Sequence, residues 1–104
     1  MFARHVSIQL KSNMLSDYMR TFEKDVLPLL HKQNGFKDDI TLSTPGSVDV
    51  IAISLWENKA SAEAYNTNAY PQVLKTMERF IEGAPKVQTF ETVTSTFHKV
   101  AVAA

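Results

Sequence analysis

The stretch "VDVIAISLWENKASAEAY", residues Val48 to Tyr65, decides the fold of this chain. Its first part, Val48 to Trp56, is apolar at nearly every position, which predicts a central strand buried on both faces. Asn58 follows at a position suited to a helix N-cap, and the small residues after it predict a helix. Trp56, the only tryptophan of the chain, therefore stands where a strand ends and a helix begins.

The residues before this stretch predict a strand, a helix and a second strand. Alternation places Phe2, Arg4, Val6, Ile8 and Leu10 on one face of the first strand, and Ala3, His5, Ser7 and Gln9 on the other. Helical spacing joins Leu15, Met19, Phe22, Val26, Leu29 and Leu30 into one apolar stripe. We expect Ser16 to cap this helix, Pro28 to kink it and Gly35 to end it. Phe36 to Thr44 predicts a weaker strand, and Thr44 to Ser47 a type II turn.

The residues after this stretch predict a broken helix and a last strand. Asn66 to Pro71 interrupts the helix, and Gly83 and Pro85 close it. Val87 to Val100 is rich in threonine, valine and phenylalanine, which favours one long strand. The order is therefore β-α-β-β-α-β, a ferredoxin-like α+β arrangement in which an antiparallel sheet carries both helices on one face. We expect the first and third strands to be central, and a length of 104 residues fits a single domain, residues 1–104.

Two helices cover only one face of such a sheet, and the other face is apolar here. Ile51, Ile53 and Leu55 would form an exposed patch that soluble monomers rarely carry. We therefore expect a homodimer, packed sheet to sheet about a two-fold axis. The end of the last strand, Thr94 to Val100, is expected to pair with an edge of the partner subunit.

Composition narrows the possible partners and cofactors. The formal net charge is zero, which gives no electrostatic reason to expect nucleic acid or an anionic membrane as a partner. No apolar run approaches the roughly 20 residues of a membrane span, and the alternating N-terminus predicts a strand rather than a signal peptide. The chain contains no cysteine, so a cytoplasmic protein is expected. Because no two histidines have the local spacing of a metal site, we expect no metal and no other cofactor.

The element order and three segments resemble a known family. "LPLLHKQNGF" ends the first helix, and "ISLWENKASAEAYN" is followed by "YPQVLKTM". Together they resemble the antibiotic biosynthesis monooxygenase (ABM) family of the dimeric α+β barrel superfamily, over essentially the whole chain. The resemblance implies a dimeric barrel that binds its ligand between the helices and the sheet.

The catalytic residues of the family match this chain only in part. The branch that oxygenates aromatic polyketides has an Asn four residues before the strand-end Trp and a Tyr six residues after it. Trp56 matches, but the other two positions hold Ala52 and Ala62. In the haem-degrading branch, the positions of the Asn, Trp and His hold Val6, Tyr65 and Lys75. The resemblance therefore does not imply a haem.

We expect a ligand pocket with aromatic walls around Trp56. Its expected lining is Trp56, Tyr65, Phe22, Met19, Met77, Phe80, Ala52 and Ser54. The alternative for Trp56 is that it belongs to the core alone. Ala60 and Ala64 begin the helix above it, and small residues beside a large indole leave either close packing or a cleft.

The candidate catalytic residues are His5, Tyr65 and Arg4. His5 is either a hydrogen-bonded residue of the dimer interface or a general base. Tyr65, with Tyr70, is either a pocket lid or an amphipathic surface aromatic. Arg4 either extends to solvent at the sheet edge or pairs with a carboxylate. The pair Asp38–Asp39 is interpreted as a solvated strand start.

Three kinds of function fit these residues. The first is a small cofactor-independent monooxygenase acting on an electron-rich aromatic or quinol-type molecule, which would itself supply electrons to oxygen while the protein stabilises its anion in a dry pocket. The second is a non-catalytic dimeric barrel that binds a small molecule or serves a stress response. The third is a dimer that works through its outer surface, with the pocket filled by its own side chains. Alanine at both transferred polar positions weakens the first function relative to the second.

Overall fold

Four strands form one antiparallel sheet in the order β2-β3-β1-β4. A computed structural model describes residues 1–100; residues 101–104, which the expected single domain includes, lie outside the described residues. The strands are β1 (Phe2–Gln9), β2 (Phe36–Ser43), β3 (Asp49–Trp56) and β4 (Lys86–Glu91). The predicted central position of the first and third strands is confirmed.

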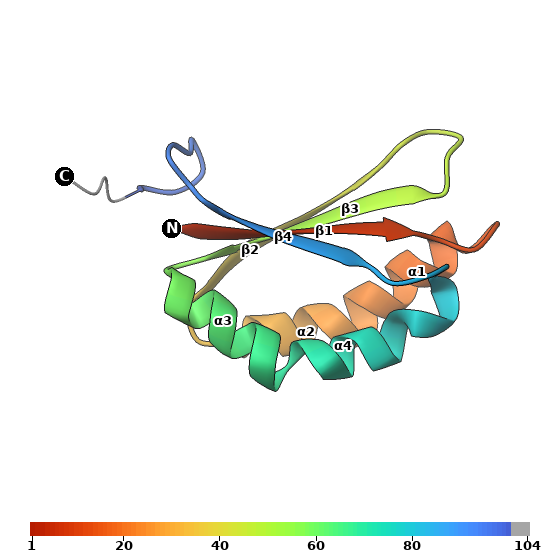
Figure 1. The fold of residues 1–104 in the computed structure, drawn as a ribbon, viewed down its shortest axis with the longest axis horizontal. Helices are drawn as coiled ribbons and strands as arrows, with labels where there is room; N and C mark the ends of the chain where they lie inside the picture. The colour runs from red at the N-terminus through yellow and green to blue at the C-terminus, as the bar shows by residue number, and fades with distance from the viewer. Residues whose placement is uncertain (101–104) are drawn as a thin grey trace.

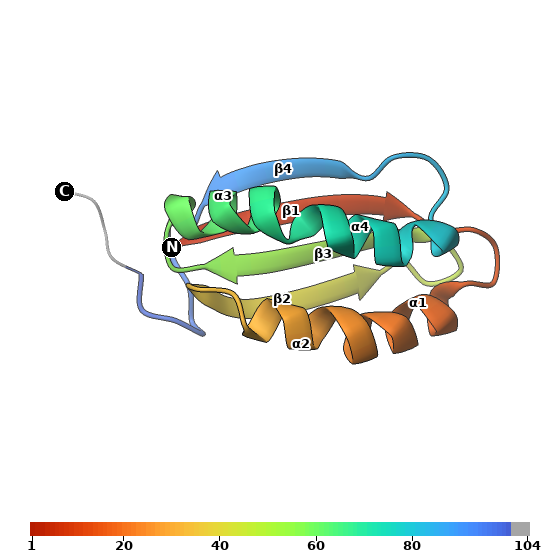
Figure 2. The same cartoon turned by 90° about the horizontal axis from the view of Figure 1, so that it is seen from below.

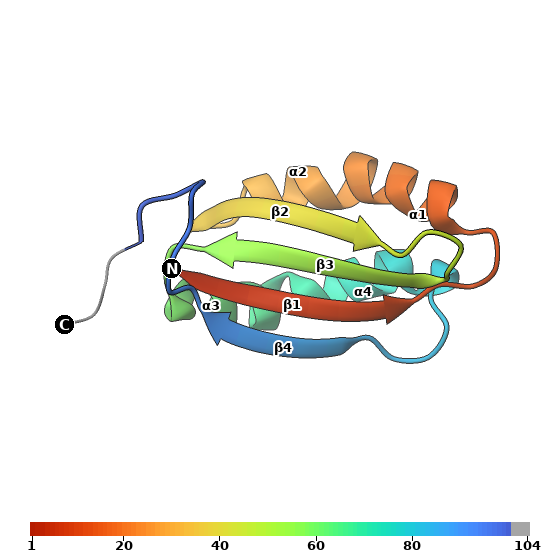
Figure 3. The ribbon, with the colours of Figure 1, turned by 90° about the horizontal axis from the view of Figure 1, so that it is seen from above.

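The helical segments lie together beneath one face of this sheet (Figure 1). They are α1 (Leu15–Thr21), the π-helix η1 (Phe22–Val26), α2 (Leu27–His31), α3 (Lys59–Asn68), α4 (Tyr70–Met77) and the 3₁₀ turn η2 (Glu78–Phe80). Figure 2 shows the two helical stretches side by side, running roughly along the direction of the strands. Figure 3 shows the sheet face that none of the described helices covers. The predicted ferredoxin-like fold class is confirmed. Within residues 1–100, no helix combines the length and the apolar composition needed to cross a bilayer.

The first helical stretch differs from the prediction at its start and its middle. It begins at Leu15 with Met14 at the N-cap, so Ser16 lies inside the first turn and does not cap it. Near Pro28 the chain forms a π-helix, whose end is marked by a bond from the Leu27 N–H to the Phe22 carbonyl. Proline lacks the donor that a regular helix needs at that point, and a π-turn is one way in which a helix accommodates such a break.

The second helical stretch follows the prediction closely. Asn58 caps α3 by accepting a hydrogen bond from the Ser61 N–H at 2.8 Å. The expected break falls at Ala69, and Pro71 lies in the first turn of α4, where its missing donor is not needed. This break brings Tyr65 and Tyr70 close together, with 6.0 Å between ring centroids.

A β-bulge in β2 decides which of its side chains face the helices. Phe36 pairs with Trp56, but the next pair is Asp38 with Leu55, because the register shifts between Phe36 and Asp38. One extra residue in a strand reverses the faces of all residues beyond it. Asp39 therefore lies opposite Ser54, on the side of the helices.

The last strand is shorter than predicted, which corrects the expected strand over Val87 to Val100. Pairing with β1 runs only from Ser7↔Lys86 to Phe2↔Glu91. A final hydrogen bond, just outside both strands, joins the Thr92 N–H to the Met1 carbonyl at 2.8 Å. Residues 92–100 leave the sheet without regular structure. In this segment His98 contacts the carboxylate of Asp38.

The helix-free face of the sheet is apolar, as the sequence predicts. Ile51, Ile53 and Leu55 are partly buried on it. Because of the bulge, Ile40 and Leu42 join them, with 50% and 46% of their surface exposed. Phe90 of β4 extends the patch, with 51% exposed. The patch is therefore larger than the three residues of β3 indicated.

Candidate functional site

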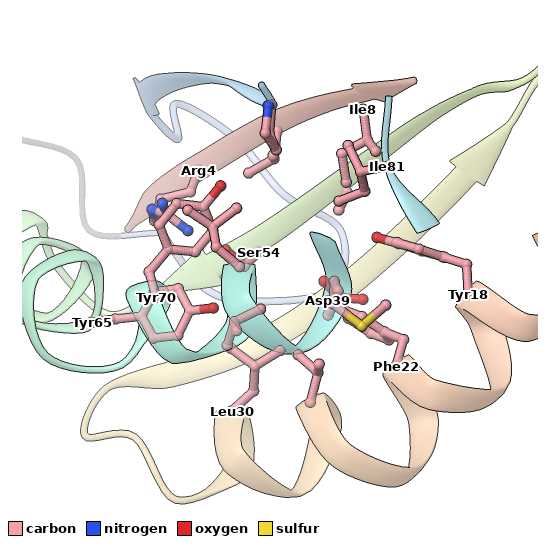
Figure 4. A pocket seen from close by; sticks show the side chains of 17 residues that line it. Arg4, Ile8, Tyr18, Phe22, Leu30, Asp39, Ser54, Tyr65, Tyr70 and Ile81 are labelled. Atoms are coloured by element: carbon pink, nitrogen blue, oxygen red, sulfur yellow. The ribbon is translucent and has the colours of Figure 1, made fainter. Parts of the chain in front are cut away.

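A cavity lies between the sheet and the helices, at the centre of the subunit (Figure 4). Its volume is about 50 Å³. Most of its wall is apolar: Val6, Ile8, Phe22, Val26, Leu30, Ala52, Val73, Leu74, Met77, Ile81 and Pro85. A cavity that holds benzene measures roughly 150 Å³, so an aromatic ligand requires some of these side chains to move apart. Such a shape, apolar with a few polar groups, is typical of small-molecule sites.

The polar groups of the cavity lie in one row across the sheet. The register pairs Asp39 of β2 with Ser54 of β3, and Ser54 with Arg4 of β1. All three side chains line the cavity, with Ser54 between the other two (Figure 4). Adjacent strands are about 4.8 Å apart, so the backbones of Asp39 and Arg4 are separated by about 10 Å. The Asp39 carboxyl group and the Arg4 guanidinium therefore line one apolar cavity from its two sides.

Arg4 is buried, with 2% of its surface exposed, and holds its charge without a carboxylate partner among the described residues. Its Nη2 donates a hydrogen bond to Asn66 Oδ1 at 2.9 Å. The guanidinium lies 4.3 Å from the ring centroid of Tyr70 and 5.0 Å from that of Tyr65. The expectation of solvent exposure or a carboxylate pair is therefore wrong: cation–π contacts and an amide replace them. Arg4 also borders an open hollow between α3 and β4, so it forms the end wall of the cavity.

Asp39 is a partly buried carboxyl group, not the solvated strand start that the sequence suggested. Burial raises its pKa to about 6, and a hydrogen bond from Thr41 partly opposes that rise. The Thr41 hydroxyl donates to Asp39 Oδ2 at 3.3 Å. A carboxyl group whose pKa is close to neutral is suited to accept and return protons. Sequence alternation missed it because Asp39 faces inward only through the bulge.

Tyrosine hydroxyls add further polar groups to the wall. Tyr18 of α1 points toward the cavity (Figure 4), and burial raises the pKa of its hydroxyl. Burial also raises the pKa of Tyr65, an effect that the Arg4 cation partly offsets. Tyr18 was missed in the predicted stripe. The four-residue spacing of Tyr18, Phe22, Val26 and Leu30, all buried, is the signal that would have found it.

Trp56 is fully buried and stands behind the cavity wall. Its ring stacks on Tyr65 with centroids 4.8 Å apart and meets the edge of Phe36 at 5.5 Å. Its Nε1 donates a hydrogen bond to Ser54 Oγ at 2.9 Å. Trp56 therefore supports two cavity residues, Tyr65 and Ser54, without lining the cavity itself.

The expected roof of Ala60 and Ala64 is wrong, because both are exposed. The buried side of α3 is formed by Ala62 and Tyr65 instead.

The structure brings most of the predicted pocket residues together. Those that line the cavity are Tyr65, Phe22, Met77, Ala52 and Ser54, joined by the catalytic candidate Arg4. Trp56, Met19 and Phe80 belong to the surrounding core and do not line it. Tyr70, the second half of the expected lid, is a wall residue. The part of these residues in ligand binding stays a prediction.

His5 is separated from this group by the sheet. Its register partners Ile53 and Gln88 place it on the helix-free face, where its ring meets the edge of Phe90 at 6.1 Å. His5 Nδ1 is buried and has no hydrogen-bond partner within the described subunit. His5 therefore cannot act in the same cavity as Arg4 and Tyr65. In residues 1–100 no group of three or more His, Asp or Glu side chains is placed to hold a metal ion.

Solved structures with the same fold are named as monooxygenases. The chain matches an antibiotic biosynthesis monooxygenase, so named, from Bordetella bronchiseptica with a TM-score of 0.75 and 12% identity, over 89% of this chain and 97% of that one. It matches SnoaB, a cofactor-independent oxygenase from Streptomyces nogalater, with a TM-score of 0.75 and 8% identity, over 91% and 95%. It also matches a similarly named protein from Nitrosomonas europaea with a TM-score of 0.73 and 11% identity, over 90% of this chain and 100% of that one.

These likenesses are likenesses of fold. No protein-family model matches the chain, and no curated protein matches it in sequence. The chain has the fold of the antibiotic biosynthesis monooxygenases, which is the fold that its resemblance to that family implied.

Proposed function

We propose that this protein is a small monooxygenase of the ABM family that acts, without a cofactor, on an electron-rich aromatic or quinol-type molecule. The observation that supports it is the apolar cavity between sheet and helices, which carries Arg4 and Asp39 on its floor. A cation in a dry site stabilises an anionic substrate far better than water does. The likeness in fold to SnoaB, a cofactor-independent oxygenase, supports the same class of reaction.

The proposed reaction needs no oxidant except O₂. A phenol loses its hydroxyl proton to become an electron-rich phenolate, which passes electrons to O₂ and forms a carbon–oxygen bond at a ring carbon. The ring C–H bond then breaks, one oxygen atom stays as a carbonyl, and the other leaves as water. The substrate loses four electrons and O₂ gains four, so the product is a quinone. The protein binds the ring, holds its anion and excludes bulk water.

Ligand binding in this proposal requires the cavity to widen. Tyr70 is partly exposed and stands at the break between α3 and α4. Its ring covers the Arg4 guanidinium. We expect this ring to move aside when a ligand binds, so that the ligand ring takes its place near the cation.

A non-catalytic binding protein is the second candidate function. Ala52 lines the cavity and Ala62 is buried in the core, at the two positions where the resemblance would place an Asn and a Tyr. Methyl groups at these positions can pack against a ligand but cannot donate or accept protons. This observation favours binding without turnover, in the same cavity.

The proposed assembly is a homodimer in the cytoplasm, joined through the helix-free face of the sheet. Ile40, Ile53 and Phe90 belong to the apolar patch on this face. A second copy is the simplest cover for an exposed apolar patch of this kind. The buried Nδ1 of His5 on the same face supports a partner that supplies its missing hydrogen bond.

Oxygen uptake tests the proposed reaction directly. We expect uptake with one or more compounds from a panel of quinols and hydroxylated aromatics, with one water and one quinone formed per O₂. Ala52→Leu should abolish uptake, because the added side chain fills the cavity. Ala64→Leu is the matched control, since Ala64 is exposed on α3. Binding of panel compounds without any uptake would favour the non-catalytic candidate.

A further inference from the structure

The Asp39 carboxyl group and the Arg4 cation line the same apolar cavity from its two sides. Asp39 and Arg4 lie at the two ends of a row whose centre is Ser54. The Ser54 hydroxyl already accepts the Trp56 N–H. The backbones of the two charged residues are about 10 Å apart. Once the cavity has widened, a single substituted ring between them can meet Asp39 at one end and Arg4 at the other.

The bulge in β2 is the feature that creates this arrangement. Without it, strand alternation from Phe36 would turn Asp38 toward the helices and Asp39 toward the helix-free face. Instead Asp38 pairs with Leu55 and contacts His98 on the outer side, and Asp39 faces the cavity. Bulges that re-aim a side chain are enriched next to active sites.

We propose that Asp39 is the proton acceptor of this site and Arg4 its anion holder, so that the substrate carries an acidic hydroxyl at one end of a single ring and an electron-accepting oxygen group at the other. This inference rests on the proposed function and assigns the first step of its reaction. The substrate hydroxyl faces Asp39, and the far oxygen, in a carbonyl or similar uncharged group, faces Arg4. Charge released at the hydroxyl then spreads through the ring toward the cation.

The step itself is a proton transfer. The O–H bond of the substrate breaks, its electron pair stays on the substrate oxygen, and the proton joins a carboxylate oxygen of Asp39. One negative charge is present in the site before and after the transfer. It moves from Asp39 to the substrate, and thus closer to Arg4.

Asp39 is the cavity group that titrates between weakly acidic and neutral pH. Burial raises its pKa to about 6. The other charged or titratable groups that face the cavity are Tyr18 from α1, Tyr65 from α3, Tyr70 from α4 and Arg4 from β1. Burial raises the pKa of each of these tyrosines.

Binding of 4-nitrophenol tests the proposal without turnover. Its phenolate absorbs visible light, and its nitro group accepts charge at the far end of the ring. At a weakly acidic pH, at which the free probe is mostly protonated, we expect the wild-type protein to bring up the phenolate band on binding. No proton should reach the buffer, because Asp39 takes it. Calorimetry in buffers of different ionisation enthalpy counts the protons released.

Variants separate the two roles. Asp39→Asn should bind the probe with no phenolate band, or with one proton released per phenolate formed. Asp38→Asn, next in sequence but on the opposite face, should behave as wild type. Arg4→Gln should weaken binding by about tenfold or more, because a charge-assisted contact is lost, and Arg4→Lys should restore part of it. Emission of Trp56 checks that each variant is folded.

The outcomes distinguish this inference from the proposed function. Proton release from the wild type, unchanged proton balance in Asp39→Asn, or an equal effect of Asp38→Asn overturns the role of Asp39. Failure of the wild type to bind 4-nitrophenol overturns the substrate class. If Asp39→Asn takes up oxygen as fast as the wild type, the proposed monooxygenase activity is kept and the role of Asp39 is overturned. If Asp39 takes the proton of the probe but no substrate causes oxygen uptake, the role of Asp39 is supported and the proposed monooxygenase activity is overturned.

Discussion

The partly buried carboxyl group of Asp39 should lower the stability of the fold at neutral pH, where it is charged. Its carboxylate faces a largely apolar cavity, where water solvates the charged form poorly. The group opposite, Arg4, is about 10 Å away along the sheet and already engages Asn66, Tyr65 and Tyr70. The charge on Asp39 is therefore only weakly compensated in the empty cavity.

The replacement Asp39→Asn should stabilise the protein at neutral pH. The folded protein holds this proton more tightly than the unfolded chain, since burial raises the pKa of Asp39 to about 6, above the ordinary value of about 4. The stability that this group contributes is complete below pH ~4 and is lost as the pH rises through ~6. We expect the free energy of unfolding of the variant to be about 1–3 kcal/mol higher than that of the wild type at pH 7.5. This gain should vanish near pH ~4.

Urea unfolding at the two pH values measures this difference. Asp38→Asn is the control: Asp38 is exposed on the outer side of the sheet and contacts the His98 imidazole, so no gain at neutral pH is expected from it. A gain that is equal at both pH values would show that solvation of the Asp39 charge is not its cause.

At the scale of elements, the link between α2 and β2 is set by one glycine. Gly35 has a φ of +81°, which favours glycine. Its carbonyl accepts the Glu57 N–H at 2.7 Å, which ties this link to the end of β3. A Cβ at Gly35 would lie 2.3 Å from the Ser61 Oγ at the start of α3. The glycine is therefore needed for backbone conformation and also for the close approach of α3.

The substitution Gly35→Ala should destabilise the fold more than Gly46→Ala. Gly46 has a similar φ of +75°, but no atom lies within 4 Å of its would-be Cβ. We expect a loss of about 1–2 kcal/mol for Gly46→Ala from the left-handed backbone alone. For Gly35→Ala a further 1–3 kcal/mol, roughly, should come from overpacking against Ser61. Chemical denaturation of both variants gives the comparison, and equal losses would contradict a role for the Ser61 contact.

At the scale of the whole molecule, the two faces of the sheet differ in kind. The helices cover one face and enclose the cavity, whereas the other carries Ile40, Leu42, Ile53 and Phe90 at its surface (Figure 3). An apolar area of this kind on a soluble protein marks an interaction surface. The proposed homodimer would bury it and leave the cavity of each subunit on the outside of the interface.

The substitution Ile53→Asp should convert the dimer to monomers or unfold it, because an unpaired charge would be buried at the centre of the interface. Light scattering at micromolar concentration measures the mass in solution. Leu15→Asp is the control, since Leu15 is exposed at the start of α1, away from the sheet face. A wild-type monomer, or an Ile53→Asp dimer as stable as the control, would contradict the sheet-to-sheet interface.

Local chemistry was enough to determine the order of the elements and much of the cavity floor. The apolar run before Trp56 identified β3 as a central strand, which is its place in the sheet. Asn58 marked the start of α3, since its side chain satisfies a donor only three residues away. Alternation in β1 assigned Arg4 to the helix side, where the structure has it. Each of these features depends on neighbours in the sequence.

Tertiary structure decided the features that depend on residues far away in the chain. Asp39 faces the cavity because pairing with β3 shifts register at the bulge. The last strand is only as long as its pairing with β1, which stops where Glu91 lies opposite Phe2. Trp56 lies behind the wall because Tyr65 of α3 stacks between it and the Arg4 side chain. Periodicity along the chain shows which residues share a face of a strand or helix. Strand register and ring stacking depend on how segments that are distant in the sequence pack against one another.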